Sequence, residues 1–131
     1  MTGIHTNVLV RYLTQDDPVQ SPIATRFIEK NCTAESPGFI PVLVLVELVW
    51  VLQSHYGASR DEIIKVVTTL LQTRQLAVDA ADLVWQAVRL YQSCDAGFAD
   101  CLIERQCHAV GIGVVTFDKS AAKAGMALLM K

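Results

Sequence analysis

Three acidic residues in this chain have settings that suit a metal-binding site. Glu47 is the only charged residue in the apolar stretch of residues 39–52. A carboxylate buried in such a stretch costs several kcal/mol unless another group pairs with it or it coordinates an ion. Asp100 lies among apolar neighbours in the first turn of an expected helix, and Asp118 follows an apolar run. Carboxylates at the ends of elements suit a hard divalent cation with oxygen ligands, such as Mg²⁺ or Mn²⁺.

Two of these acids also have a simpler structural interpretation. An aspartate near a helix N-terminus, such as Asp100, is favoured by the helix dipole without any further role. Asp118 can cap the helix expected after it. Glu47 has no such explanation, because it is expected in the middle of an apolar helix.

The elements that must position these acids alternate between strand and helix. This alternation predicts an α/β fold with a parallel sheet of four or five strands covered on both faces, in a single domain over residues 1–131. The expected strands are residues 1–4, 39–40, 76–79, a buried strand at 112–117, and 127–129. The expected helices are residues 8–13, 21–31, 42–56, 59–73, 80–93, 98–107 and a short segment after 118.

Local signals set several of these boundaries. Ser21 followed by Pro22 is typical of a helix N-cap and first turn. The β-branched residues of 42–56 also suit a strand, but the length of the run and Gly57 at its end favour a helix. Ser59 and Glu62 have the spacing of a capping box.

Polar residues follow two of the strands. His5-Thr6-Asn7 comes after the first strand, and Thr116-Phe117-Asp118 ends the fourth. Ligands of parallel α/β sheets bind beyond the carboxyl ends of the strands. We therefore expect these two segments to share one rim of the sheet.

Composition limits the class of protein. Hydrophobic residues make up 52% of the chain and charged residues 18%, which suggests an apolar surface for a second copy or another protein. The formal net charge is −2 without a Lys/Arg block, which neither indicates nor excludes nucleic-acid binding. No secretory signal and no membrane-spanning run is evident. The four cysteines lack CxxC spacing, so we expect reduced thiols in a cytoplasmic protein rather than a zinc site.

Four segments together resemble the motifs of PIN-domain ribonucleases, and most closely the VapC toxins of bacterial toxin–antitoxin pairs. These segments are residues 3–13, 46–52, 97–103 and 115–118. The resemblance implies a three-layer α/β/α fold and Mg²⁺- or Mn²⁺-dependent cleavage of RNA. It also implies a homodimer and inhibition by a VapB-type antitoxin whose C-terminal segment fills the groove, in a heterotetramer or larger complex.

The resemblance extends to single residues. Glu47, Asp100 and Asp118 match the second, third and fourth family acids. Thr116 matches the small hydroxyl residue that accompanies the last acid, and Asn7 the polar residue after the first.

The first family acid is missing, because His5 stands where the family has a metal-binding aspartate. Imidazole is a softer ligand that suits Zn, Ni or Mn better than Mg²⁺, and its protonated form repels a cation. Close relatives often have a further aspartate where this chain has Gly97. Asp95 is two residues earlier and is expected in a solvated loop. These losses predict weakened metal binding.

The implied chemistry is phosphodiester hydrolysis assisted by divalent ions. Glu47, Asp100, Asp118 and His5 are the expected metal ligands, while Thr116 and Asn7 orient water or phosphate. Two interpretations of Arg11 remain open, an RNA backbone contact and a solvated or dimer-interface arginine. We interpret Trp50 and Trp85 as core or interface residues, although either ring could also stack a base. We interpret His55 and His108 as surface histidines.

Two other classes of function remain open. One is a catalytically inactive PIN domain that only dimerises and binds antitoxin or RNA. The other is a phospho-acceptor signalling domain, which also places acids at strand ends, with Lys119 nearby. That class requires an acceptor aspartate at the end of a mid-chain strand, for which Asp79 is the only candidate.

Overall fold

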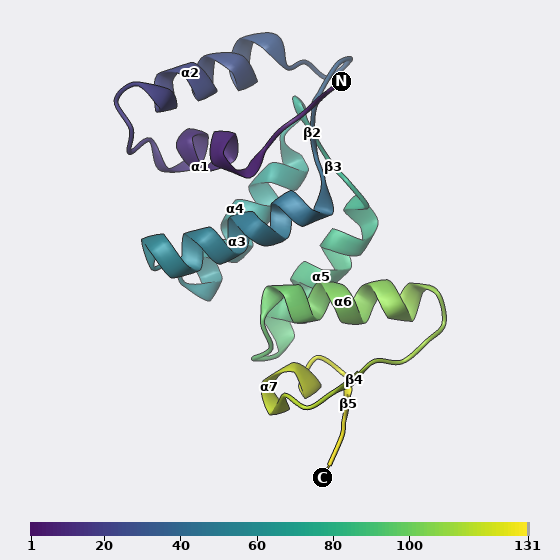
Figure 1. Cartoon of the computed structure of the whole chain (residues 1–131). Helices are drawn as coiled ribbons and strands as arrows, with labels where there is room; N and C mark the ends of the chain where they lie inside the picture. The colour runs from purple at the N-terminus through teal and green to yellow at the C-terminus, as the bar shows by residue number, and fades with distance from the viewer. Residues whose placement is uncertain (131) are drawn as a thin grey trace. The chain divides into compact units, whose positions relative to one another are not determined.

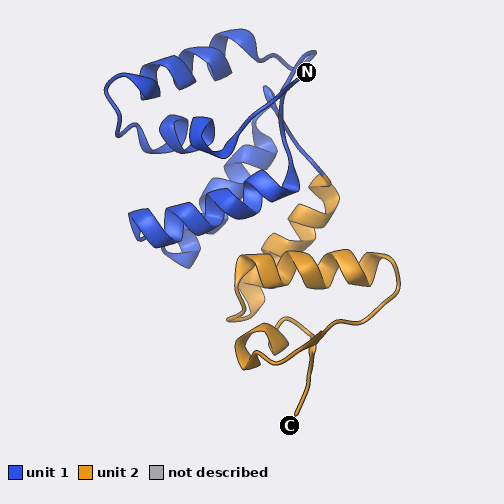
Figure 2. Cartoon of the chain, viewed as in Figure 1, with its two compact units in different colours: residues 1–79 blue, residues 80–131 orange. Residues whose placement is uncertain are grey.

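The structure, a computed structural model, describes residues 1–130. The chain forms two compact units, residues 1–79 and residues 80–131. Figure 1 shows the elements in chain order, and Figure 2 shows the two units in blue and orange.

Unit 1 is built on a three-stranded parallel sheet in the order β1-β2-β3. The strands are β1 (Thr2–Gly3), β2 (Gly38–Ile40) and β3 (Leu76–Val78). Thr2 pairs with Gly38, and Gly38 pairs with Leu76. Gly38 leaves little room for a side chain, because a Cβ atom at this position would lie 3.0 Å from the Ile4 side chain and 3.1 Å from the sulfur of Cys32.

Helices connect these parallel strands. They are α1 (Thr6–Thr14), α2 (Gln20–Arg26), which continues into the π-helical turn η1 (Phe27–Asn31), α3 (Val42–Tyr56) and α4 (Arg60–Gln72). Two predicted helix signals are confirmed. Gly57 ends α3 in the left-handed conformation with φ 66°, and Ser59 and Glu62 form the capping box of α4.

The predicted start of α2 was wrong, because Asp17 and not Ser21 satisfies the first N–H groups. Asp17 Oδ1 accepts hydrogen bonds from the N–H groups of Val19 at 2.9 Å and Gln20 at 2.7 Å. Ser21 lies inside the helix, is 2% exposed, and accepts a hydrogen bond from the Asp17 N–H at 3.3 Å. A carboxylate that reaches two N–H groups is the stronger cap here.

The core of unit 1 is formed by one face of each long helix. Five residues of α3 are buried, and they recur with helical spacing. The buried residues of the four α-helices of unit 1 are Thr6, Leu9, Val10, Ser21, Ala24, Val44, Leu45, Leu48, Val49, Leu52, Ile63, Val67 and Leu70.

Unit 2 contains a helix pair and a small sheet. Helices α5 (Ala81–Ser93) and α6 (Phe98–Ala109) pack through Tyr91 and Phe98, whose ring centroids are 5.7 Å apart at an interplanar angle of 89°. Strands β4 (Val115–Thr116) and β5 (Ala127–Leu128) pair in parallel and enclose the short helix α7 (Lys119–Ala122).

The structure confirms the α/β class and the parallel direction of the strands. Among residues 1–130 the five strands form one sheet of three and one of two. The prediction of a buried strand over residues 112–117 was wrong. Only Val115 and Thr116 are paired, and Ile112 and Phe117 are 58% and 75% exposed. Glycine is depleted in strands, and Gly113 interrupts this segment, so that within unit 2 only its end pairs with β5. Up to residue 130, no helix is both long and apolar enough to cross a membrane.

Candidate active site

The polar segment after β1 lies at the start of α1, as the sequence predicts. His5 is the N-cap residue of α1, with extended backbone angles (φ −79°, ψ 156°) and an exposed side chain. Its carbonyl oxygen accepts a hydrogen bond from the Val8 N–H at 3.1 Å. Asn7 is also exposed, whereas Thr6 is buried at 7% exposure. The turn between strand and helix therefore directs alternate polar side chains outward and inward.

Thr6 is a site residue that the sequence analysis did not assign a role. Its hydroxyl donates a hydrogen bond of 2.6 Å to Glu47 Oε1, across 41 residues of sequence. A hydroxyl–carboxylate bond of this length is charge-assisted and strong. It fixes the rotation of the Glu47 carboxylate. The only sequence signal was a hydroxyl residue between His5 and Asn7, which does not identify its partner.

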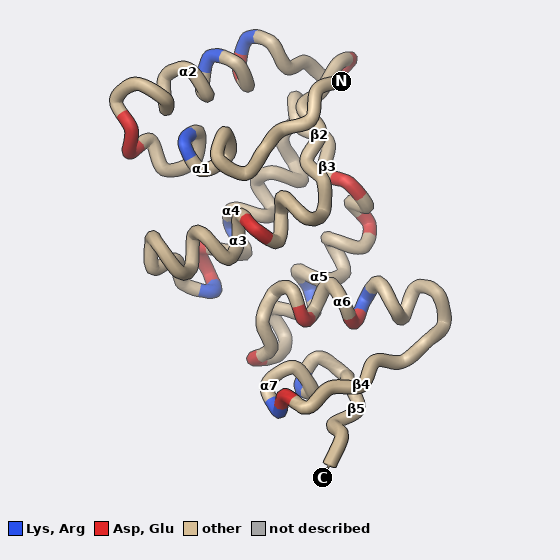
Figure 3. Tube along the Cα trace, in the orientation of Figure 1, with Lys and Arg blue, Asp and Glu red and all other residues tan. Residues whose placement is uncertain are grey.

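The prediction that Glu47 is buried was wrong. Glu47 is exposed, and it is the only Asp, Glu, Lys or Arg residue on α3 (Figure 3). It shares the exposed side of the helix with Leu43, which is 79% exposed, and Trp50, which is 61% exposed. The apolar run is misleading because it covers both the core face of α3 and this open face. Trp50 is therefore not a core residue, while His55 is exposed as expected.

A hollow of about 400 Å³ surrounds these groups in unit 1. Its lining combines one carboxylate, two imidazoles and one guanidinium with aromatic rings. The residues are His5, Thr6, Asn7, Val10, Arg11, Glu47, Trp50, Val51, His55 and Tyr56. Three of the predicted unit 1 site residues and Arg11 therefore open onto the same space.

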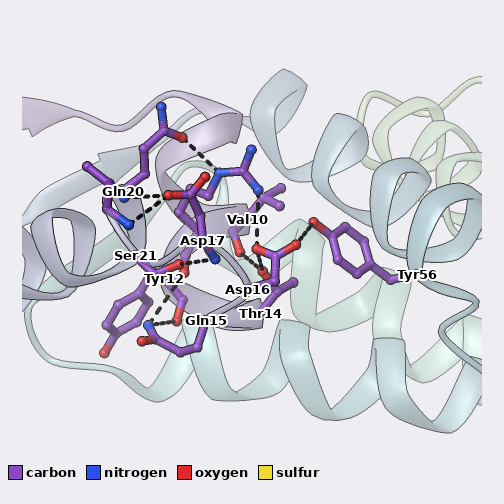
Figure 4. A network of polar contacts seen from close by, with 11 residues as sticks. Val10, Tyr12, Thr14, Gln15, Asp16, Asp17, Gln20, Ser21 and Tyr56 are labelled. Atoms are coloured by element: carbon purple, nitrogen blue, oxygen red, sulfur yellow. Dashed lines mark hydrogen bonds and ion pairs between the residues drawn. The ribbon is translucent and has the colours of Figure 1, made fainter.

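A polar network around Asp16 links the end of α1 to Tyr56 at the end of α3 (Figure 4). Arg11 of α1 belongs to this network. It donates to Gln20 Oε1 at 2.8 Å through Nε and to Asp16 Oδ1 at 3.2 Å through Nη1. The hydroxyls of Tyr56 and Thr14 donate to Asp16 at 2.6 and 2.7 Å. These hydrogen bonds, that of Tyr56 first, lower the pKa of Asp16 from 3.8 to about 2. The network gives Arg11 a structural role, so its RNA contact stays a prediction.

In unit 2, Asp100 is partly exposed in the first turn of α6, whose N-cap is Gly97. A Cβ atom built on Gly97 would lie 3.3 Å from Asp100 Oδ2, so a side chain at position 97 would meet this carboxylate directly. Asp95 lies in a bend and is 84% exposed, with Lys123 Nζ 3.8 Å away. The predicted solvated position of Asp95 is confirmed.

Asp118 caps α7, as its structural interpretation predicted. Asp118 Oδ1 accepts a hydrogen bond from the Ser120 N–H at 2.8 Å, and the Asp118 N–H donates to Thr116 Oγ1 at 3.0 Å. Thr116 and Asp118 are thus coupled in one turn. Capping does not exclude metal binding, because a carboxylate has about four lone-pair sites.

The predicted metal ligands are divided between the units: His5 and Glu47 in unit 1, Asp100 and Asp118 in unit 2. Within either unit, the described residues contain no group of three His, Cys, Asp or Glu side chains placed to hold a metal ion. Three carboxylates suit Mg²⁺ or Mn²⁺, whereas the imidazole of His5 suits Mn²⁺ better than Mg²⁺. Convergence of the four side chains stays a prediction.

Comparison with known proteins gives the family. Residues 4–126 match the PIN domain, a stretch that includes all the predicted site residues. The chain belongs to the PIN-domain family. It is also similar to a VapC ribonuclease of Aquifex aeolicus (strain VF5), with 30% identity over 126 residues that cover 95% of this chain and 93% of that protein. The predicted resemblance of the chain to VapC-type PIN-domain ribonucleases is confirmed.

Proposed function

We propose that this protein is a metal-dependent endoribonuclease, the toxin of a VapBC-like toxin–antitoxin pair. The observation that carries the proposal is the near full-length similarity to a VapC ribonuclease. The acids Glu47, Asp100 and Asp118 and the hydroxyl of Thr116 are all present at the motif positions. A nuclease is therefore a better explanation of these side chains than a phospho-acceptor domain. That domain also needs two adjacent acids after its first strand, where this chain has His5-Thr6-Asn7.

Each side chain has a distinct role in this proposal. Glu47, Asp100, Asp118 and His5 are the residues that would hold Mg²⁺ or Mn²⁺. When bound, the ion supplies positive charge that activates a water and offsets the charge developing on the leaving 3′ oxygen. Thr6 orients Glu47 through its 2.6 Å hydrogen bond, and Thr116 orients the turn that carries Asp118. Asn7 positions water or phosphate, and Arg11 holds the RNA backbone.

His5 weakens this site, because an imidazole replaces one negative charge next to a hard cation. The alternative function is a catalytically inactive PIN domain that dimerises and binds antitoxin or RNA. The exposed position of His5 favours a changed ligand over a buried structural residue.

The proposed partners are RNA, a VapB-like antitoxin and a second copy of this chain, in the cytoplasm. A second hollow of unit 1, about 520 Å³, has an apolar lining that includes Ile4, Val8, Ile23 and Phe27. Ile23 is 59% exposed there. Such a surface supports the binding of another polypeptide. Co-purification with the product of the neighbouring gene, and sedimentation velocity at micromolar concentration, test these partners.

The enzymatic proposal is tested by incubating total RNA with the purified protein and Mg²⁺ or Mn²⁺, with EDTA as control. Cleavage that EDTA and Asp100→Asn both abolish supports the nuclease. Cleavage that survives both changes contradicts it.

A further inference from the structure

The indole of Trp50 is the largest exposed ring in the hollow that also contains Glu47. It is 61% exposed, although tryptophan side chains are highly buried on average. Trp50 follows Glu47 by three residues on α3, and residues at this spacing have Cβ atoms about 5–6 Å apart. A flat apolar surface therefore lies next to the carboxylate proposed to act on the phosphodiester.

A second ring positions this indole. His55 lies against Trp50 with a centroid distance of 5.4 Å and an interplanar angle of 88°. His55 is in the last turn of α3, so both rings are carried by one rigid helix. Tyr56, which lines the same hollow, is fixed by its hydrogen bond to Asp16. The aromatic side of the hollow is therefore preorganised.

Three further residues of the lining are polar. His5, Asn7 and Arg11 bring two types of hydrogen-bond donor and an amide that can both donate and accept. An aliphatic docking groove would not combine these groups with exposed rings. Single-stranded RNA is recognised by this combination, with bases stacked on aromatic side chains and their edges hydrogen-bonded to polar ones.

We propose that this hollow is a nucleobase subsite, in which a base of single-stranded RNA next to the scissile phosphate stacks on Trp50. The inference rests on the proposed nuclease function and names how its substrate is held. Stacking accepts every base, so Trp50 fixes the position of the strand more than its sequence.

Fluorescence can test this subsite in the absence of metal and cleavage. The chain has two tryptophans, so Trp85→Phe leaves Trp50 as the single fluorophore. We expect a 2′-O-methyl RNA hexamer in EDTA to quench this fluorescence in a saturable manner. An abasic oligomer of the same length should quench little, because it offers phosphates without bases.

Matched variants separate stacking from simple apolar contact. Trp50→Leu keeps an apolar side chain without a ring. Measured by the anisotropy of a dye-labelled hexamer, it should weaken binding about 5- to 150-fold, the range typical of one base–aromatic stack. Trp50→Phe keeps a ring and should weaken it less. Equal binding by all three proteins, unchanged fluorescence, or equal quenching by the abasic oligomer would overturn the subsite.

Two further measurements decide whether Trp50 contacts RNA or another protein chain. If Trp50→Leu disrupts the dimer or antitoxin binding while hexamer affinity is unchanged, Trp50 is a protein contact and the subsite is wrong. RNA cleavage without base-dependent quenching leaves the nuclease intact and removes the subsite. Base-dependent quenching in a protein that never cleaves RNA, even as His5→Asp, supports the subsite and removes the nuclease.

Discussion

Glu47 in unit 1 and Asp118 in unit 2 are held in opposite ways. Glu47 is fixed by a hydroxyl 41 residues away in sequence, whereas Asp118 is fixed by the N–H of Ser120 in its own turn. The first arrangement exists only after α1 and α3 have packed together, while the second is already encoded in a few neighbouring residues. Substitutions at and around the two acids should therefore change the rate of RNA cleavage and the stability of the fold to different extents.

The largest expected effect comes from Asp118→Asn in a His5→Asp background. Asparagine caps helices about as well as aspartate, so stability should be retained while the negative charge is lost. We expect RNA cleavage to fall about 100-fold or more, as is typical for a group that supports a catalytic metal or oxyanion. Single-turnover cleavage and thermal unfolding of the same samples measure the two properties.

Asp118→Ala is the matched control. It removes the cap as well as the charge and should additionally destabilise the fold by about 0.5–2 kcal/mol. If Asp118→Asn cleaves RNA like its parent, Asp118 is only a helix cap.

A smaller effect is expected at the long-range contact. Thr6→Val keeps the shape of the buried side chain but removes the hydroxyl that orients Glu47. A hydrogen bond to a charged group contributes about 1.5–3 kcal/mol, and Thr6 is buried while Glu47 is exposed, so we expect about 1 kcal/mol of destabilisation. We expect RNA cleavage to fall about tenfold, which corresponds to about 1.4 kcal/mol.

Thr6→Ser restores the hydroxyl and should recover most of the cleavage rate. Recovery by serine distinguishes the hydrogen bond from packing. Equal rates for the valine variant and the parent would show that the orientation of Glu47 does not matter.

The smallest effect concerns the network between α1 and α3. Because the pKa of Asp16 is lowered from 3.8 to about 2 in the folded protein, its ionised form stabilises the fold above about pH 4. This stabilisation is lost as the pH falls from about 4 to about 2. Tyr56→Phe removes the hydrogen bond that lowers the pKa most, so the variant should lose less stability in this interval.

Urea unfolding midpoints at pH 6 and pH 3 measure this difference. Asp17 and Glu62, whose pKa values are lowered by other hydrogen bonds, contribute equally to both proteins. If Tyr56→Phe and the parent protein lose the same stability between pH 6 and pH 3, the hydrogen bond from Tyr56 is not what lowers the pKa of Asp16.

The contrast between local and long-range contacts also explains which predictions from sequence succeeded. The end of α3 at Gly57 and the Ser59–Glu62 capping box depend on neighbouring residues, and both were predicted correctly. The cap of α2 is local too, but it was predicted at Ser21, and Asp17, four residues earlier, accepts from the first N–H groups instead. Sequence spacing does not decide between them.

The exposure of Glu47 could not be predicted in the same way. It depends on which face of α3 packs against the core, and the run 42–52 is apolar on both faces. The partner of Glu47 was hidden for the same reason, since Thr6 reaches it from another helix. The resemblance to the family motifs still names Glu47, Asp100 and Asp118 as the site acids, and their role in the chemistry stays a prediction.

The most direct test of the account is the rate of RNA cleavage with Mg²⁺ and Mn²⁺ by this chain and by His5→Asp. The added carboxylate supplies the charge that the first motif lacks, so we expect the variant to cleave about 100-fold faster and to bind Mg²⁺ more tightly. Asp100→Asn in the same background should abolish the gain. A His5→Asp protein that cleaves no RNA with either ion would contradict a metal-dependent ribonuclease built on Glu47, Asp100 and Asp118.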